Sequence, residues 1–133
     1  MIKIAFATDD HRTISAHFGR ASFYEVFTVE NGIVIQKEAR PKANHSQFAE
    51  QGLHEHRPGE EHGTNPASQR RHSAMMNTIA DCQVLLARGM GMGAHDALVS
   101  HGIQPILTDI QEIEPAVKAY IDGQLVDHPE RLH

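Results

Sequence analysis

The apolar residues of this chain gather in short continuous runs that polar turns separate. Residues 3–8 form one such run, which Asp9 and Asp10 end, and residues 82–88 form another. A strand covered on both faces of a sheet carries a nearly continuous apolar run, whereas a half-exposed strand alternates. We therefore predict two strands that are buried on both faces.

A β-hairpin is predicted between these two strands. Residues 22–29 are rich in aromatic and β-branched side chains, and Asn31-Gly32 joins them to residues 33–37. An Asn-Gly pair between two such segments favours a type I′ turn, in which both turn residues have positive φ. The two segments are therefore predicted to be antiparallel neighbours.

Three segments show the spacing of helices. They are residues 65–81, 94–101 and 112–122. The first begins with Asn-Pro, a capping residue followed by a proline in the first turn. A glycine follows each of the other two directly, which is a common way for a helix to end.

A fifth strand is predicted at residues 103–108, after the second of these helices. Together with the strand at residues 82–88 it forms a right-handed βαβ unit, so the two strands are parallel. Pro105 has no N–H group to donate to a neighbouring strand, which places this strand at an edge of the sheet.

Residues 40–65 follow neither the helical nor the strand period, and glycines and prolines interrupt them. Loops of this length in compact domains are usually functional or disordered, so we predict either a lid or a mobile insertion. Residues 1–126 are predicted to form one domain that includes this loop. Residues 127–133 are predicted to form a polar C-terminal tail.

Composition narrows the class of protein. A length of 133 residues suits one domain, and 17 acidic against 12 basic side chains give a net charge of −5, which opposes nucleic-acid binding. The single cysteine, Cys82, excludes an internal disulfide and fits a reducing compartment. No segment resembles a signal peptide or reaches membrane-spanning length. We therefore expect a cytoplasmic protein that binds neither nucleic acid nor a membrane.

Two motifs carry a resemblance to a known family. HFGR at residues 17–20 lies directly before the second strand, with Ser15 and Phe23 beside it. The segment DCQVLLARGMGMGAHDALVSHGI at residues 81–103 places a glycine loop after a strand, and HG lies at residues 62–63. With the order of the predicted elements, these motifs resemble the dinitrogenase iron-molybdenum cofactor-binding family over nearly the whole chain.

The resemblance implies a ribonuclease H-like α/β fold. It implies one mixed five-stranded sheet, flanked by three helices, in which the strands lie in the order 3-2-1-4-5. It further implies a non-catalytic protein that carries or assembles a molybdenum or iron-sulfur type cluster. Such a carrier requires donor and acceptor proteins, and it is either a monomer or a homodimer.

The first and fourth strands are predicted to place both motifs in one crevice. Ligands bind at the carboxyl ends of neighbouring parallel strands, and the N–H groups at the start of the following helix favour an anion. A metallocluster of this type is an anion. The predicted cofactor-binding residues are His17, Gly19, Arg20, Gly89, Met90, Gly91, Met92 and Gly93.

The HFGR residues have two interpretations. In the first, Gly19 permits the turn, Arg20 contributes positive charge, and His17 offers a nitrogen to a metal or a donor to a sulfide. In the second, Arg20 pairs with Asp9 or Asp10, and His17 only caps the strand.

The sulfur-containing residues and His11 also have ordinary interpretations. Met90 and Met92 can present thioethers, which are soft metal ligands, or can fill the core beneath the loop. Cys82 opens an apolar strand and is expected to be a buried, inert thiol. His11 follows two aspartates on a loop and is expected to be solvated.

The loop at residues 40–65 carries a second candidate site. His54, His56 and His62 alternate with glutamates, a composition that suits borderline metal ions, although it matches no fixed zinc spacing. The protein can therefore be a buffer or sensor for divalent Zn, Ni or Cu ions instead of a cluster carrier. The same histidines can also be merely solvated, in which case the chain can be a plain interaction module.

The sequence lacks the motifs of the enzyme classes that this fold and its glycine loop bring to mind. GMGMGA lacks the GxGxxG spacing of a dinucleotide site. A nuclease of the two-metal type needs several carboxylates around magnesium ions, and only Asp9 and Asp10 are suitably placed. No pair of nucleophile and base is visible, so we predict that the protein is not an enzyme.

Overall fold

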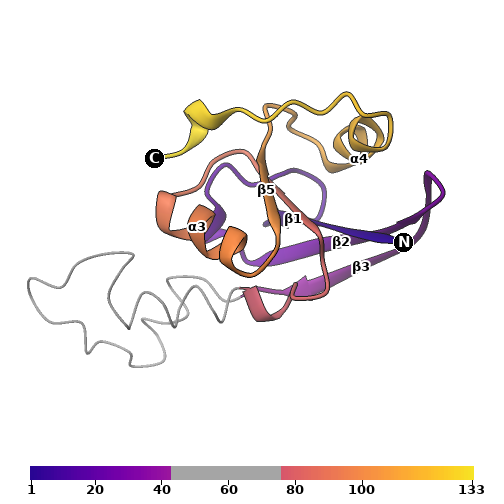
Figure 1. The fold of residues 1–133 in the computed structure, drawn as a ribbon, viewed down its shortest axis with the longest axis horizontal. Helices are drawn as coiled ribbons and strands as arrows, with labels where there is room; N and C mark the ends of the chain where they lie inside the picture. Colours follow the sequence, from indigo (N-terminus) through magenta and orange to yellow (C-terminus); the bar gives the residue numbers. More distant parts are fainter. Residues whose placement is uncertain (43–75) are drawn as a thin grey trace, which may run out of the picture.

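The computed structural model describes residues 1–42 and 76–133, and the chain forms a mixed five-stranded sheet with helices (Figure 1). The strands are β1 (Ile2–Thr8), β2 (Phe23–Glu30), β3 (Ile33–Pro41), β4 (Val84–Ala87) and β5 (Gln104–Leu107). They lie in the order β3-β2-β1-β4-β5, which confirms the predicted sheet. β1 is antiparallel to β2 and parallel to β4.

The two predicted C-terminal helices are confirmed as α3 (Met92–Ser100) and α4 (Ile113–Ile121). Two short 3₁₀ helices, η1 (Phe18–Arg20) and η2 (Pro129–Arg131), complete the described elements. The helix predicted at residues 65–81 lies mostly outside the described residues, as does most of the histidine-rich loop. At its end, Met76 and Asn77 are helical. None of the described helices is long and apolar enough to cross a membrane.

The hairpin turn and the edge position of the fifth strand are as predicted. Asn31 and Gly32 have φ angles of 53° and 74°, as a type I′ turn requires. Pro105 lies in β5, opposite Leu85, at an edge of the sheet. A proline is tolerated there because the outer side of an edge strand needs no ladder hydrogen bond.

β3 is longer than predicted, and this corrects the start of the loop. Arg40 and Pro41, which the sequence places in the loop, pair with Tyr24 and Phe23 of β2. β3 is exposed along most of its length, so its residues carry no apolar period from which its end could be read. Pairing with the long strand β2 extends it instead.

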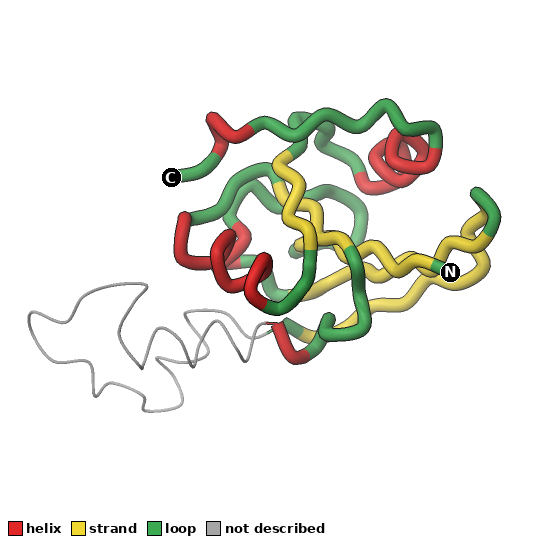
Figure 2. The backbone as a smooth tube through the Cα atoms, viewed as in Figure 1, coloured by secondary structure: helices red, strands yellow, loops and turns green. Residues whose placement is uncertain are grey.

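Alternate residues of the strands feed two core clusters, one on each face of the sheet. Ala5 and Ala7 of β1 belong to the cluster that contains Leu98 of α3. Ile4 and Phe6 belong to the cluster that contains residues 113, 116 and 117 of α4. Successive side chains of a strand point to opposite faces, so α3 and α4 cover opposite faces of the sheet (Figure 2).

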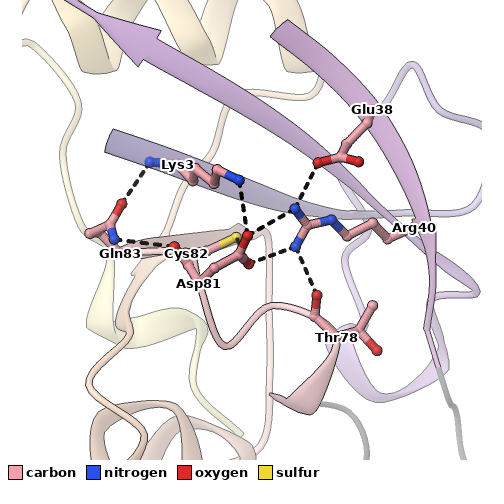
Figure 3. A network of polar contacts seen from close by, with 7 residues as sticks. All are labelled: Lys3, Glu38, Arg40, Thr78, Asp81, Cys82 and Gln83. Atoms are coloured by element: carbon pink, nitrogen blue, oxygen red, sulfur yellow. Dashed lines mark hydrogen bonds and ion pairs between the residues drawn. The ribbon is translucent and has the colours of Figure 1, made fainter. Parts of the chain in front are cut away.

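A polar network joins β3 to the segment before β4 (Figure 3). The Arg40 guanidinium donates to both carboxylate oxygens of Asp81, at 2.7 and 3.0 Å, and to the carbonyl oxygen of Thr78 at 2.9 Å. Glu38 and Lys3 add ion pairs to Arg40 and Asp81 respectively. The network therefore holds together the parts of the chain that precede and follow residues 43–75.

Residues 127–133 pack against the rest of the domain. The N–H of Leu107, in the edge strand β5, donates to the carboxylate of Asp127 at 2.8 Å, and the N–H of His128 donates to the Leu107 carbonyl at 2.7 Å. Leu132 packs against the core cluster on the α3 side. The segment predicted as a polar tail therefore covers part of the β5 edge.

Candidate functional site

The two predicted loops meet at the carboxyl ends of β1 and β4. The N–H of Ser15 donates to the carbonyl of Ala7 at 2.7 Å, and the N–H of Arg88 donates to the carbonyl of Ser15 at 2.8 Å. The N–H of Phe18 donates to the carbonyl of Gly89 at 3.1 Å. Backbone hydrogen bonds therefore fasten the HFGR turn to the glycine loop, at the same end of the sheet.

Gly89 is required by this contact between the two loops. A Cβ atom at position 89 would lie 2.5 Å from the carbonyl oxygen of Ala16, a distance that real Cβ atoms do not reach. A Cβ atom at Gly91 would lie 3.6 Å from the carbonyl oxygen of His133, which is an ordinary contact. The close approach of the two backbones thus depends on the first glycine and not on the second.

The HFGR turn is the 3₁₀ helix η1. Phe18 is fully buried, with its ring 6.3 Å from the ring of Tyr24, whereas His17 and Arg20 are exposed and Gly19 lies between them. Burial of the aromatic ring anchors the turn and leaves the imidazole and the guanidinium at the surface.

The ion pair of the second interpretation of HFGR is not supported. Within the described residues no ion pair joins Arg20 to Asp9 or Asp10. Asp9 accepts a hydrogen bond from the N–H of Ser22, at 3.0 Å. Asp10 instead accepts hydrogen bonds from the N–H groups of residues 12 and 13, and these hold the pKa of its carboxyl well below the usual range. The His17 side chain makes no capping hydrogen bond to η1.

Lys42 packs against the buried side of the HFGR turn, although the sequence predicts this lysine as part of the long loop. Its side chain is 1% exposed, with Nζ 4.5 Å from the centre of the Phe18 ring and 3.3 Å from the carbonyl oxygen of Ala21. Burial lowers the pKa of Lys42 to about 7, and the charge of Asp9 opposes this shift. No sequence motif marks this lysine, because the burial comes from tertiary packing.

The two methionines of the glycine loop have different surroundings. Met90 is 1% exposed and belongs to the core cluster, so its thioether fills the core beneath the loop. Met92 is 53% exposed in the first turn of α3, where Gly93 follows it. Of the two, only Met92 has a side chain that is exposed enough to reach a ligand.

The C-terminal segment contributes residues to the site that the sequence motifs do not include. The N–H of His133 donates to the carbonyl of Met90 at 3.0 Å, and the centre of its ring lies 6.2 Å from that of His17. Arg131 donates from Nη1 to the carbonyl of Arg88 at 3.4 Å. The sequence did not predict this contact, because residues 127–133 are polar and lie far from both motifs along the chain.

His11 is exposed, as expected, but its ring also pairs with a buried carboxylate, which the sequence did not predict. Its Nδ1 lies 2.5 Å from the carboxylate of Glu25, which is 3% exposed in β2, and its ring contacts that of Phe23. His11 adopts a φ of 63°, and its N–H donates to the hydroxyl of Thr8. A buried carboxylate needs a hydrogen-bond partner, and this one holds the loop after β1.

The described residues do not form a complete metal site. There, no group of three or more His, Cys, Asp or Glu side chains is arranged to hold a metal ion. Cys82 is buried as expected, and burial together with Asp81 raises the pKa of its thiol to about 12, which keeps it protonated. The predicted ligands His54, His56 and His62 lie outside the described residues. His17 therefore supplies one imidazole and not a closed metal site.

Solved structures share this fold. The apo form of the orange protein from Desulfovibrio gigas is 21% identical, with a TM-score of 0.65 over 97% of this chain and 94% of that protein. A proposed dinitrogenase from Methanocaldococcus jannaschii is 9% identical, with a TM-score of 0.62 over 96% and 95% of the two chains. The protein PH0822 is 20% identical, with a TM-score of 0.67 over 97% and 98%.

At these identities the structural likeness shows the fold alone. No curated protein matches the sequence. The model of one protein family, described as dinitrogenase iron-molybdenum cofactor, matches residues 1–123. Because this match spans both motifs and every strand of the sheet, the chain belongs to the dinitrogenase iron-molybdenum cofactor family.

Proposed function

We propose that this protein is a non-catalytic carrier of an anionic molybdenum or iron-sulfur type cluster, held at the carboxyl ends of β1 and β4. The observation that carries the proposal is a pair of backbone hydrogen bonds that join the two segments. Phe18 of the HFGR turn bonds Gly89 of the glycine loop at 3.1 Å, and Ser15, just before that turn, bonds Arg88 at 2.8 Å. They bring His17 and Arg20 to the same end of the sheet as the start of α3. Family membership supports a cofactor-binding role.

Charge at this end of the sheet favours an anion. The side chain of Arg20 is exposed and, among the described residues, makes no ion pair. The Nε atoms of Arg88 and Arg131 are buried without a hydrogen-bond partner. Guanidinium groups bind anions through charge-assisted hydrogen bonds, so three of them close to one loop suit a negatively charged cargo although the chain carries a net charge of −5.

The donor atoms of this site suit a cluster that is bound and released better than a cofactor that stays bound. His17 offers a neutral nitrogen to a metal or an N–H to a sulfide, and the exposed Met92 adds a soft sulfur atom. This donor set is open to solvent, so a bound cluster can leave it. We infer that the protein acts in the cytoplasm, as a monomer or homodimer, between a donor and an acceptor of the cluster. Nucleic acid and membranes are not among its proposed partners.

The proposal is tested by loading the purified protein anaerobically. We expect it to take up tetrathiomolybdate or an iron-sulfur cluster, measured by metal and sulfide analysis and by the visible spectrum. His17→Ala and Arg20→Gln should each reduce uptake severalfold. Matched controls are His101→Ala, at the far end of α3, and Arg12→Gln, on an exposed part of the loop after β1. No uptake by the unaltered protein, or equal uptake by His17→Ala, would overturn the proposal.

The divalent-ion buffer stays a second prediction, carried only by the histidine and glutamate composition of the loop. Replacement of His54, His56 and His62 by glutamine separates the two functions. Loss of Zn, Ni or Cu binding with unchanged tetrathiomolybdate uptake would assign ion binding to the loop and cargo binding to the sheet. Unchanged binding of all three ions would reject the buffer.

A further inference from the structure

We propose that His17 and His133 together hold one anionic atom of the cargo, each as an N–H donor, so that residues 127–133 form one wall of the binding site. The inference rests on the proposed function, because it requires an anionic cargo at this end of the sheet. It names the chemistry of the ligand as an anionic oxygen or sulfide atom that accepts hydrogen bonds. It also adds a residue that lies far from both motifs in the sequence.

The backbone of His133 is held in place. Its N–H donates to the carbonyl of Met90 at 3.0 Å, and Leu132 forms a parallel bridge with Met90 while its side chain packs against the core. The preceding η2 places Arg131 against the carbonyl of Arg88. The imidazole of His133 is therefore presented from a folded segment that lies along the glycine loop.

The spacing of the two imidazoles favours a shared acceptor. A hydrogen bond places an acceptor roughly 3 Å from a ring nitrogen, and so about 4 Å from the ring centre. The centres of the two rings lie 6.2 Å apart with an angle of 69° between their planes. Both rings are exposed and can rotate, so one atom between them is within reach of a nitrogen from each.

Direct ligation of one metal by both rings fits this spacing less well. A metal lies about 2 Å from an imidazole nitrogen, and so roughly 3 Å from the ring centre. Two rings on one metal would then have centres at most about 6 Å apart, and only with the metal on the line between them. With the rings as they lie, the observed 6.2 Å is at this limit, so ligation of one metal requires the rings to rotate closer together, whereas a shared hydrogen-bond acceptor does not.

The surroundings of the two rings favour an anion over a free cation. The buried Nε atoms of Arg88 and Arg131 have no hydrogen-bond partner among the described residues, so each of these two guanidinium groups keeps an N–H donor without an acceptor. Their positive charge opposes the binding of a bare divalent ion. Nε2 of His133 lies 3.5 Å from the place that a Cβ at Gly89 would occupy, so this ring nitrogen lies beside the glycine loop.

The test is titration of the full-length protein with tetrathiomolybdate and with molybdate, with bound molybdenum measured after equilibrium dialysis. His133→Ala should weaken binding about tenfold or more, the loss expected for one hydrogen bond to a charged acceptor. His133→Gln keeps an N–H donor, so its affinity for the anion should lie between that of the unaltered protein and that of His133→Ala. His101→Ala is the matched control, because its ring lies at the far end of α3 and bonds the carbonyl of Ala97.

Each outcome bears on one of the two proposals. If the unaltered protein binds neither anion, this inference fails. The proposed function fails with it only if the protein also takes up no iron-sulfur cluster. If it binds and His133→Ala binds equally well, only the inference is overturned. X-ray absorption that shows nitrogen bound directly to molybdenum would also overturn it, because the rings would then act as ligands. The backbone contact of His133 does not involve its side chain, so we expect both variants to fold. Circular dichroism of each variant checks this.

Discussion

Gly89 illustrates how a single missing side chain allows the site to form. We predict that Gly89→Ala destabilises the protein by about 1–3 kcal/mol, because the added Cβ would lie 2.5 Å from the carbonyl oxygen of Ala16 and neither backbone can move freely. The same change should reduce cargo uptake, since it separates the two loops. Urea unfolding and metal analysis measure the two effects.

Gly91→Ala is the matched control for this prediction. Its Cβ would make an ordinary contact at 3.6 Å, and Gly91 has φ of −78°, which alanine adopts readily. We expect a change in stability within about 0.5 kcal/mol, because alanine also lowers the entropy of the unfolded chain. Equal losses for the two variants would show that the loop contact does not explain the requirement for Gly89.

Lys42 predicts an unusual dependence of stability on pH. Burial lowers its pKa from 10.5 to about 7, so between these values the unfolded chain binds a proton that the folded chain does not. Its contribution to stability therefore falls as the pH is lowered from 10.5 to 7 and is constant below. As the pH is lowered through this window, the stability of Lys42→Met should rise relative to that of the unaltered protein by a few kcal/mol in total, on the order of 1.4 kcal/mol for each pH unit. The lost packing of the neutral lysine against the rings of Phe18 and Tyr24 subtracts an amount that does not depend on pH in this window.

Urea unfolding at pH 7 and pH 10 measures this difference. Lys37→Met is the matched control, because Lys37 lies 5.4 Å from the ring of Phe27 but is 47% exposed. A stability difference between Lys42→Met and the unaltered protein that does not change between the two pH values would contradict the prediction.

Among the elements, β3 depends on a polar contact at its end rather than on burial. Arg40 forms two hydrogen bonds with Asp81, and these hold the pKa of Asp81 well below its usual range. A lowered pKa in the folded state gives stability that is present above the unfolded pKa of about 3.8 and is lost as the pH falls. Asp81→Asn should cost about 1 kcal/mol at pH 7, since Asp81 is 47% exposed and solvent screens the pair.

The cost of Asp81→Asn should shrink at pH 3, because Asp81 takes up a proton in the unfolded chain there while it stays ionised in the folded protein. Asp96→Asn is a suitable control, because Asp96 is 71% exposed and only reaches His95 at 3.7 Å. Urea unfolding at both pH values provides the measurement. A cost for Asp81→Asn that is unchanged at pH 3 would show that its charge is not the source of the stability.

The elements that could be predicted from the sequence are those whose burial leaves a pattern. β1 and β4 carry continuous apolar runs because α3 and α4 cover both faces, and Asn31-Gly32 has the chemistry that its turn requires. The end of β3 could not be predicted, because exposed residues show no period. The approach of HFGR to the glycine loop followed from the parallel arrangement of β1 and β4.

At the scale of the whole molecule, the two edges of the sheet differ. The C-terminal segment covers part of β5, whereas the other edge strand, β3, exposes Ile33, Val34 and Ile35 among the described residues. Prediction of the covered edge was not possible, because Asp127 and His128 are polar residues whose partners are backbone groups. The contribution of His133 to the candidate site was missed for the same reason.

We predict that the C-terminal segment unfolds together with the sheet rather than fraying first. Asp127 accepts a hydrogen bond from the N–H of Leu107, and His128 donates to the carbonyl of the same residue. Asp127→Ala leaves the Leu107 amide without its acceptor and should cost about 1 kcal/mol. It should also speed hydrogen exchange at the amides of His128 and His133, because the segment loses its anchor to β5.

Hydrogen exchange followed by NMR tests this coupling between the fold and the candidate site. Asp122→Ala is the control, since Asp122 is exposed at the end of α4 and makes no side-chain contact with β5 among the described residues. In the unaltered protein the amide of His133 should exchange slowly, because it donates to Met90. Rapid exchange at His133 would show that this segment opens independently. Its imidazole would then not be held beside that of His17, as a hydrogen bond from both rings to one atom of the cargo requires.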